Sequence, residues 1–359
     1  MFLDLIILFI LSIFLSLWLI LLIKKLFYKL KILDNPKKYN LKRKAIPYST
    51  WIIFFISFFI LSYFYIFRDI LWDNSELIQK LFLLWWFWFI VSFISFLDDL
   101  LDVNPKIRLI VQIIIWAIIW ITSIKVGYIS NIFWWIINLN IFSINIFNHE
   151  IFLIPIIFTI IWYVFIFNSL NWTDWIRWNT TWISIISFLI LFFLWLKLYF
   201  QDNYIWWIEN AKFIMKISII LVWILIPFFW FDIKNKILMW DSWTMFLAFM
   251  LASLAIVAGW KIATVLVVFW IYSVDAIYVI FNRLKNKKNP LSWDFTHLHH
   301  RLLKIWFTEK QVLIFVFSLS TIFWIAALFL DKIWKIIVFI LIILIVIFIN
   351  KIKKLKFKK

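Results

Sequence analysis

The chain has 359 residues, of which 66% are hydrophobic, a formal net charge of +18 and no cysteine. Repeated apolar runs of about 20 residues are typical of an integral membrane protein and argue against a large soluble domain. The lack of cysteine excludes disulfides, a thiolate zinc site and a cysteine nucleophile. Because the basic residues lie between the apolar runs, we attribute the charge to contact with anionic membrane lipids, not to nucleic acid.

Apolar runs separated by polar linkers predict an all-α membrane protein with about eleven transmembrane helices. The first run follows no basic segment and is longer than a signal-peptide core, so we interpret it as a span. Residues 129–150 are too polar for a span, and we expect an extracytoplasmic β-hairpin or loop there. Residues 1–359 are predicted to form one membrane domain with a basic tail at 351–359. The predicted spans are 2–23, 50–67, 81–97, 109–124, 151–167, 182–200, 213–231, 244–259, 262–281, 311–330 and 333–350.

Lys and Arg residues gather in alternate linkers, which places 27 of the 36 on one side of the membrane. By the positive-inside rule that side is cytoplasmic, so the N-terminus is expected outside and the C-terminus inside. Polar side chains gathered at one membrane face favour an active site, whereas a transporter more often carries them near the midplane. Four polar clusters fall on this predicted cytoplasmic face: 97–108, 168–182, 232–243 and 282–310.

Three aspartates, Asp98, Asp99 and Asp102, follow the third predicted span. Their spacing puts Asp98 and Asp102 on one helical face, with Asp99 about 100° away. Carboxylates grouped in this way suit Mg²⁺ with phosphate, or a general base. The alternative is a solvated helix end whose acids pair with Lys106 and Arg108.

Two further polar stretches lie between spans. The first, NSLNWTDWIRWNTTW, contains Asn168, Asn171 and Asp174. If its tryptophans were glycines, the loop would offer backbone N–H groups to a phosphate and a carboxylate to the metal of that phosphate. The second, WDSW, contains Asp241, for which a plain helix N-cap is the alternative.

All histidines except His149 occur in the segment HLHHR, as His297, His299 and His300, next to Arg301. Without cysteine or an HExxH spacing, nothing favours a zinc site. Imidazoles and an arginine beside acidic loops fit the binding of a diphosphate or a sugar. A solvated loop is the alternative.

Glycine is scarce and tryptophan abundant: 2 glycines and 28 tryptophans are present, whereas ordinary usage predicts about 25 glycines. Glycine adopts positive φ and allows close backbone approach, which an indole does not. Some bacteria read UGA as glycine, and translating UGA as tryptophan would produce this pattern. We therefore expect glycine at most such positions in the natural protein; a Trp-rich interfacial belt is the alternative and fits Trp18. The positions beside turn residues include Trp172, Trp175, Trp178, Trp182, Trp240, Trp243 and Trp293.

The motifs LDDLLDVNPKIRLIVQ, NSLNWTDWIRWNTTW, WDSWTMFLAF and DFTHLHHRLL occur in this order. Together they resemble the polyprenyl-phosphate N-acetylhexosamine-1-phosphate transferases (glycosyltransferase family 4), the family of the bacterial WecA and TagO enzymes, which is related to MraY. The resemblance covers about residues 30–315. The HLHH segment favours the N-acetylhexosamine branch over the muramyl-pentapeptide branch.

This resemblance implies an eleven-helix bundle in the bacterial inner (plasma) membrane, with its active site on the cytoplasmic face. The implied enzyme uses Mg²⁺, with Mn²⁺ as the alternative. It transfers a sugar-1-phosphate from a UDP-N-acetylhexosamine to undecaprenyl phosphate and releases UMP, as the first step of cell-envelope glycan synthesis. A homodimer is a possible assembly. The alternative functions are a phospho-N-acetylmuramoyl-pentapeptide transferase, a non-catalytic transporter and an inactive homologue.

By motif, the implied catalytic acids are Asp98 and Asp99, and the implied metal ligands are Asp174 and Asp98. Arg177 stands where the family often has a second aspartate, and Phe295 and Thr296 replace an expected Arg-Gly, which leaves the donor sugar open. The implied substrate-binding residues are Lys106, Arg108, Asn168, Asn171, Asp241, His297, His299, His300 and Arg301.

Overall fold

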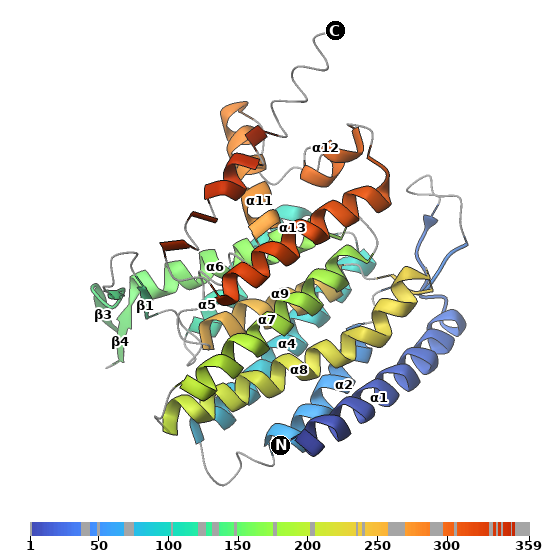
Figure 1. Cartoon of the computed structure of the whole chain (residues 1–359), viewed down its shortest axis with the longest axis horizontal. Coiled ribbons are helices and arrows are strands. Elements are labelled where there is room, and N and C mark those ends of the chain that lie inside the picture. Colours follow the sequence, from blue (N-terminus) through green and yellow to red (C-terminus); the bar gives the residue numbers. More distant parts are fainter. Residues whose placement is uncertain are drawn as a thin grey trace.

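Helices make up most of the computed structural model of the chain (Figure 1). They are α1 (Phe2–Lys29), α2 (Trp51–Ser62) continued by the π-helical η2 (Tyr63–Phe67), α4 (Ser75–Leu101), α5 (Pro105–Trp120), α6 (Leu153–Asn171), α7 (Asn179–Gln201), α8 (Ile205–Ile233), α9 (Asp241–Val257), α11 (Trp270–Lys285), α12 (Leu298–Lys304) and α13 (Glu309–Phe329). The structure describes residues 2–36, 44–48, 51–67, 75–101, 103–120, 127–130, 136–146, 149–174, 178–201, 205–234, 236–238, 241–257, 270–287, 297–304, 307–329, 333–334, 337–338, 340–345 and 347–348.

The described helices include five that are long and apolar enough to cross a membrane, so the chain is a multi-pass membrane protein. A helix of 20 residues is about 30 Å long, which matches the hydrocarbon core of a bilayer. Shorter apolar helices accompany these spans. Each of the first ten predicted spans overlaps a helix, and the described residues of the eleventh, 333–350, are also helical. The five candidate spans are Ile6–Lys29, Glu76–Leu101, Leu153–Asn171, Asn179–Phe200 and Ile208–Ile233.

Four short strands form two antiparallel hairpins between α5 and α6, so the fold is mostly helical with a small β part in the segment where a hairpin or loop was expected. The strands are β1 (Tyr128–Ser130) with β2 (Ile136–Asn138), and β3 (Ser143–Ile146) with β4 (His149–Phe152). A hairpin was predicted in this segment, and the structure has two. Because β4 leads directly into α6, the strands lie at the start of that helix, about 28 Å from its last residue. Figure 1 shows them at one edge of the bundle.

Helix α9 lies in the core of the bundle, packed against α4 and α6. Every residue from Ser242 to Ala255 is buried, as expected for a helix that is apolar on all sides. Two hydrogen bonds fix it to α6: the hydroxyls of Tyr163 and Ser253 lie 2.8 Å apart, and Trp162 Nε1 donates to the Ala252 carbonyl at 3.2 Å. This packing holds the first residue of α9, Asp241, against neighbouring helix ends.

Candidate active site

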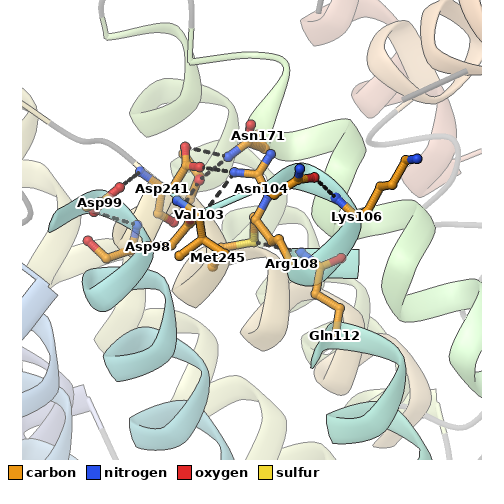
Figure 2. Close-up of polar contacts among 12 residues, drawn as sticks. Asp98, Asp99, Val103, Asn104, Lys106, Arg108, Gln112, Asn171, Asp241 and Met245 are labelled. Carbon is orange, nitrogen blue, oxygen red and sulfur yellow. Dashed lines mark hydrogen bonds and ion pairs between the residues drawn. The ribbon is translucent and has the colours of Figure 1, made fainter. Parts of the chain in front are cut away.

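The ends of α4 and α6 meet the starts of α5 and α9 at one end of the bundle (Figure 2). Five side chains from these four helices form one hydrogen-bonded group, called here the carboxylate cluster. Each was predicted as a site residue, and the prediction that separate motifs meet at one place agrees with this geometry. The members are Asp98, Asp99, Arg108, Asn171 and Asp241.

The carboxylate of Asp99 caps the start of α9. Its two oxygens accept hydrogen bonds from the backbone N–H groups of Asp241 and Ser242, both at 3.2 Å. The first N–H groups of a helix have no partner within the helix, and the helix dipole favours a negative charge at this end. Asp99 therefore ties the end of α4 to the start of α9. The alternative in which Asp241 is a plain N-cap is wrong, because Asp99 accepts the first N–H groups of α9 and the side chain of Asp241 binds Arg108 and Asn171.

The guanidinium of Arg108 joins two carboxylates. Its Nη1 lies 3.1 Å from Asp98 Oδ2 and 2.5 Å from Asp241 Oδ2. Asn171 Nδ2 donates to the other oxygen of Asp241 at 2.8 Å and to Thr244 Oγ1 at 3.3 Å. Burial disfavours the charge of Arg108, but the carboxylates of Asp241 and Asp98 outweigh this effect and raise the pKa of Arg108 above its ordinary value.

The side chains of Asp98 and Asn104 fix the turn between α4 and α5. Asp98 Oδ1 accepts a hydrogen bond from the backbone N–H of Val103 at 3.2 Å. Asn104 Oδ1 accepts one from the backbone N–H of Lys106 at 3.0 Å and so caps the start of α5. One oxygen of Asp98 therefore binds the backbone of the turn at Val103, and the other binds the side chain of Arg108. In Figure 2 the side chain of Lys106 points away from the carboxylates.

Loss of the Asp99 cap is expected to lower stability. Asp99→Ala should reduce the free energy of unfolding by about 0.5–2 kcal/mol, since it removes the acceptor for two N–H groups at a helix start. Asp99→Asn should cost less, because its amide oxygen still accepts. Thermal unfolding in detergent measures both changes, and equal midpoints for Asp99→Ala and the wild type would show that α9 does not depend on this cap.

A second polar group contains two of the predicted residues, His297 and Arg301, with an acid that sequence reasoning did not select. Asp275 on α11 lies 2.9 Å from His297 Nδ1 and forms an ion pair with Arg301. All three residues are at most 5% exposed. One signal could have identified Asp275: it is an acid inside an apolar run, and such acids usually have a specific partner.

The remaining predicted residues lie near these two groups or outside the described part. Asn168 Nδ2 donates to the Val164 carbonyl of its own helix at 2.8 Å. Asp174 lies in the turn after α6, where its backbone N–H donates to the Asn171 carbonyl at 3.2 Å. His300 is half-buried on α12. Asp102, Arg177 and the side chain of His299 lie outside the described residues, so the prediction that Asp98 and Asp102 share a helical face is not tested.

Two tryptophans occupy positions that suit glycine, one because of its backbone conformation and one because its ring is crowded. Trp178 has φ of 54°, a left-handed conformation that is strained for a bulky residue and relaxed for glycine. Within α9, the ring centroid of Trp243 lies 3.3 Å from that of Phe54 and 3.9 Å from that of Phe228. Aromatic pairs normally keep about 4.5–7 Å between centroids, so the indole at residue 243 is crowded. Both positions support the expectation that glycine occupies them in the natural protein.

The carboxylate cluster is compatible with a divalent cation. Among the described residues, no group of three or more His, Cys, Asp or Glu side chains is arranged to hold a metal unaided. Mg²⁺, however, usually takes one or two carboxylates and completes its shell with water and substrate phosphate oxygens. Asp98 and Asp241 each place one oxygen on the same nitrogen of Arg108. These two carboxylates can therefore converge on one cationic centre.

Comparison with known proteins places the chain in a family. A bundle of membrane helices with acids, an amide and an arginine gathered at one end fits a membrane-bound transferase. The chain belongs to glycosyl transferase family 4, which it matches over residues 81–259. This segment runs from α4 to just beyond α9, so it contains the whole carboxylate cluster. The chain is also 22% identical over 264 residues to the probable undecaprenyl-phosphate N-acetylglucosaminyl 1-phosphate transferase of Bacillus subtilis (strain 168), covering 70% of this chain and 68% of that protein.

Proposed function

We propose that the protein transfers an N-acetylhexosamine 1-phosphate from a UDP-sugar to undecaprenyl phosphate and releases UMP. The reaction takes place at the cytoplasmic face of the bacterial plasma membrane and begins the synthesis of a cell-envelope glycan. The observation that carries the proposal is the carboxylate cluster, which lies at one end of the membrane bundle and inside the segment that matches the family. The name of the B. subtilis relative supports the choice of lipid and sugar.

The proposed reaction makes few covalent demands on the protein. An oxygen of the lipid phosphate forms a bond to the sugar-linked phosphorus, and the bond from that phosphorus to the oxygen retained by UMP breaks. Phosphoryl transfer depends mainly on positioning and charge neutralisation. The guanidinium of Arg108 supplies a positive charge, and a planar guanidinium binds phosphate oxygens well. Asn171 orients Asp241 beside it through the 2.8 Å hydrogen bond.

The two adjacent aspartates are assigned different roles. Both oxygens of Asp99 bind the start of α9, so its role is to position Asp241. Asp98 instead contacts Arg108, whose side chain can move to a phosphate when substrate binds. Asp98 is therefore the carboxylate that contacts the lipid phosphate and accepts its proton. This assignment divides the pair of catalytic acids implied by the resemblance into one reacting group and one positioning group.

Mg²⁺ is the proposed cofactor, with Mn²⁺ as the alternative, and it would neutralise charge on the diphosphate. Asp98 and Asp174, the metal ligands that the resemblance implies, would supply the carboxylate oxygens that such an ion prefers. Chelation with EDTA should abolish UMP release, and added Mg²⁺ should restore it. Asp174→Asn should reduce transfer on the order of 10²-fold while the protein still inserts into membranes. Normal UMP release by Asp174→Asn would show that this residue is not a metal ligand. Normal release in EDTA would show that the reaction needs no metal.

The test of the function itself is the release of UMP by membranes that contain the protein. Release should require both a UDP-N-acetylhexosamine and undecaprenyl phosphate, and omission of either should abolish it. UDP-muramyl-pentapeptide serves as the competing donor, because that branch of the resemblance remains the alternative. If UMP is released only with the pentapeptide donor, that compound is the donor and the proposed one is wrong. No release with any donor would contradict the proposed function.

A further inference from the structure

We propose that Asp275 is a positioning residue that sets helix α12 and His297 against the end of α6 and thereby determines affinity for the sugar-nucleotide donor. The proposal rests on the proposed function. Nothing in the sequence motifs or in the family resemblance selects Asp275. What supports the proposal is the set of contacts that the side chain of Asp275 makes.

The carboxylate of Asp275 has three hydrogen-bonding partners in one short segment. Oδ2 pairs with His297 Nδ1 at 2.9 Å, and Oδ1 accepts both the backbone N–H of Leu298 at 2.9 Å and a guanidinium N–H of Arg301. Asp275 is 3% exposed, and His297 and Arg301 are 5% and 4% exposed. Because a buried carboxylate is costly without partners, these three contacts act together to hold the segment in place.

Helix α12 needs such a contact to keep its position. It spans only the residues Leu298–Lys304, and isolated helices shorter than about 12–15 residues are marginal in water. Its tertiary contacts therefore decide where it lies. Asp275 binds the first backbone N–H of α12 and, one turn later, the side chain of Arg301, so a single carboxylate fixes both the start and the orientation of the helix.

His297 connects this anchor to the carboxylate cluster. Its ring centroid lies 4.9 Å from that of Trp172, the residue that directly follows Asn171, and Asn171 donates to Asp241. The bond from Nδ1 to Asp275 also fixes the orientation of the imidazole, which turns Nε2 away from Asp275. The ring contact requires an indole at residue 172, but α11 also packs against α6, and none of the three Asp275 contacts involves a tryptophan. The anchor and its place beside α6 therefore do not depend on whether residue 172 is tryptophan or glycine.

Steady-state kinetics with both substrates tests the functional part. Asp275→Asn should raise KM for the UDP-sugar by about 10-fold or more, with kcat and KM for undecaprenyl phosphate within about 3-fold of wild type. Ser62→Ala is the matched control, because it also removes a buried side-chain hydrogen bond, that from Trp85 Nε1 at 2.8 Å, but between α2 and α4. It should leave KM for the donor unchanged. An Asp275→Asn enzyme with wild-type donor KM, or one that loses only kcat, would overturn the proposal.

A double-mutant cycle tests whether Asp275 acts through His297. If it does, Asp275→Asn combined with His297→Gln should raise the donor KM no further than His297→Gln alone. Fully multiplied effects would show that the two residues act independently and would contradict the proposal. His297→Gln also provides the test by itself if Asp275→Asn does not fold, since it leaves the ion pair of Asp275 with Arg301 intact and should still raise the donor KM.

A third readout does not depend on catalysis. The chain has no cysteine, so Leu303→Cys on α12 introduces a single reporter thiol at a half-buried position. Adding Asp275→Asn should accelerate modification of this thiol by a soluble maleimide by about 10-fold, because local opening becomes easier. An unchanged rate would overturn the anchoring role. Faster labelling in a chain that transfers no sugar phosphate would support the anchor and contradict the proposed function, so the two failures are distinguishable.

Discussion

Asp98→Asn is expected to lower kcat by a factor of about 10² or more, the usual loss when a general base is removed. The amide keeps the size of the carboxylate and can still accept the backbone N–H of Val103, so the turn after α4 should persist. It cannot accept a proton from the lipid phosphate, and it removes one of the two carboxylates beside Arg108. The measurement is the rate of UMP release at saturating concentrations of both substrates.

The matched control for this variant lies on the same helix. Glu76→Gln also replaces a carboxylate by an amide on α4, but at its first turn, about 33 Å from Asp98 along the helix. Glu76 is half exposed and pairs with the buried Lys80, so this variant weakens an ion pair that lies far from the carboxylate cluster. Its kcat should equal that of the wild type. A wild-type kcat for Asp98→Asn would mean that this residue only shapes the α4–α5 turn.

Glycine in place of the tryptophans at the polar turns is expected to produce a more stable and more active protein than the printed sequence. At residue 178, removing a side chain from a left-handed backbone relieves about 1–2 kcal/mol. At residue 243, removing an overpacked ring relieves about 1–3 kcal/mol, which offsets the cost of about 1 kcal/mol for glycine inside α9. At residues 172 and 175, glycine frees the backbone of the loop after α6 to approach a phosphate. Thermal unfolding in detergent and UMP release measure the two effects on the same preparation.

A control variant separates this effect from a general preference for glycine. Trp18 lies on α1 and is 59% exposed, which fits a side chain that faces lipid. Trp18→Gly should lower stability by about 1 kcal/mol, the cost of glycine inside a helix. Peptide mass spectrometry of the natural protein across residues 168–182 then gives the identities directly. Tryptophan at residues 172, 175, 178 and 182 would sink the recoding hypothesis and favour the inactive homologue.

The positions of the helices were predictable because apolar length alone specifies a membrane span. Their ends were less predictable where polar residues remain helical. Residues 151–167 were predicted to form a span, whereas α6 continues to Asn171. Asn168 stays helical because its amide donates to the Val164 carbonyl one turn earlier. In the same way α4 continues through Asp98 and Asp99 to Leu101, where the acids find partners in other helices.

The polar residues near helix ends were predictable, but their partners were not. Sequence spacing places Asp98 and Asp99 at a helix end, yet it does not show that Asp99 binds the start of a helix 142 residues later. That contact depends on the packing of α9 against α4. Asp275 was missed because its three partners belong to a segment more than 20 residues away. Only tertiary structure reveals such an anchor.

Tracing the β-phosphorus of the sugar nucleotide tests the central claim most directly. Membranes containing the protein would receive undecaprenyl phosphate and a UDP-N-acetylhexosamine labelled with ³²P at the β-phosphate. Transfer of a sugar-1-phosphate predicts that the label enters the organic-extractable lipid while unlabelled UMP appears in equal amount. Label that stays in the aqueous phase as UDP, with sugar on the lipid, would show transfer of the sugar alone and would contradict the account.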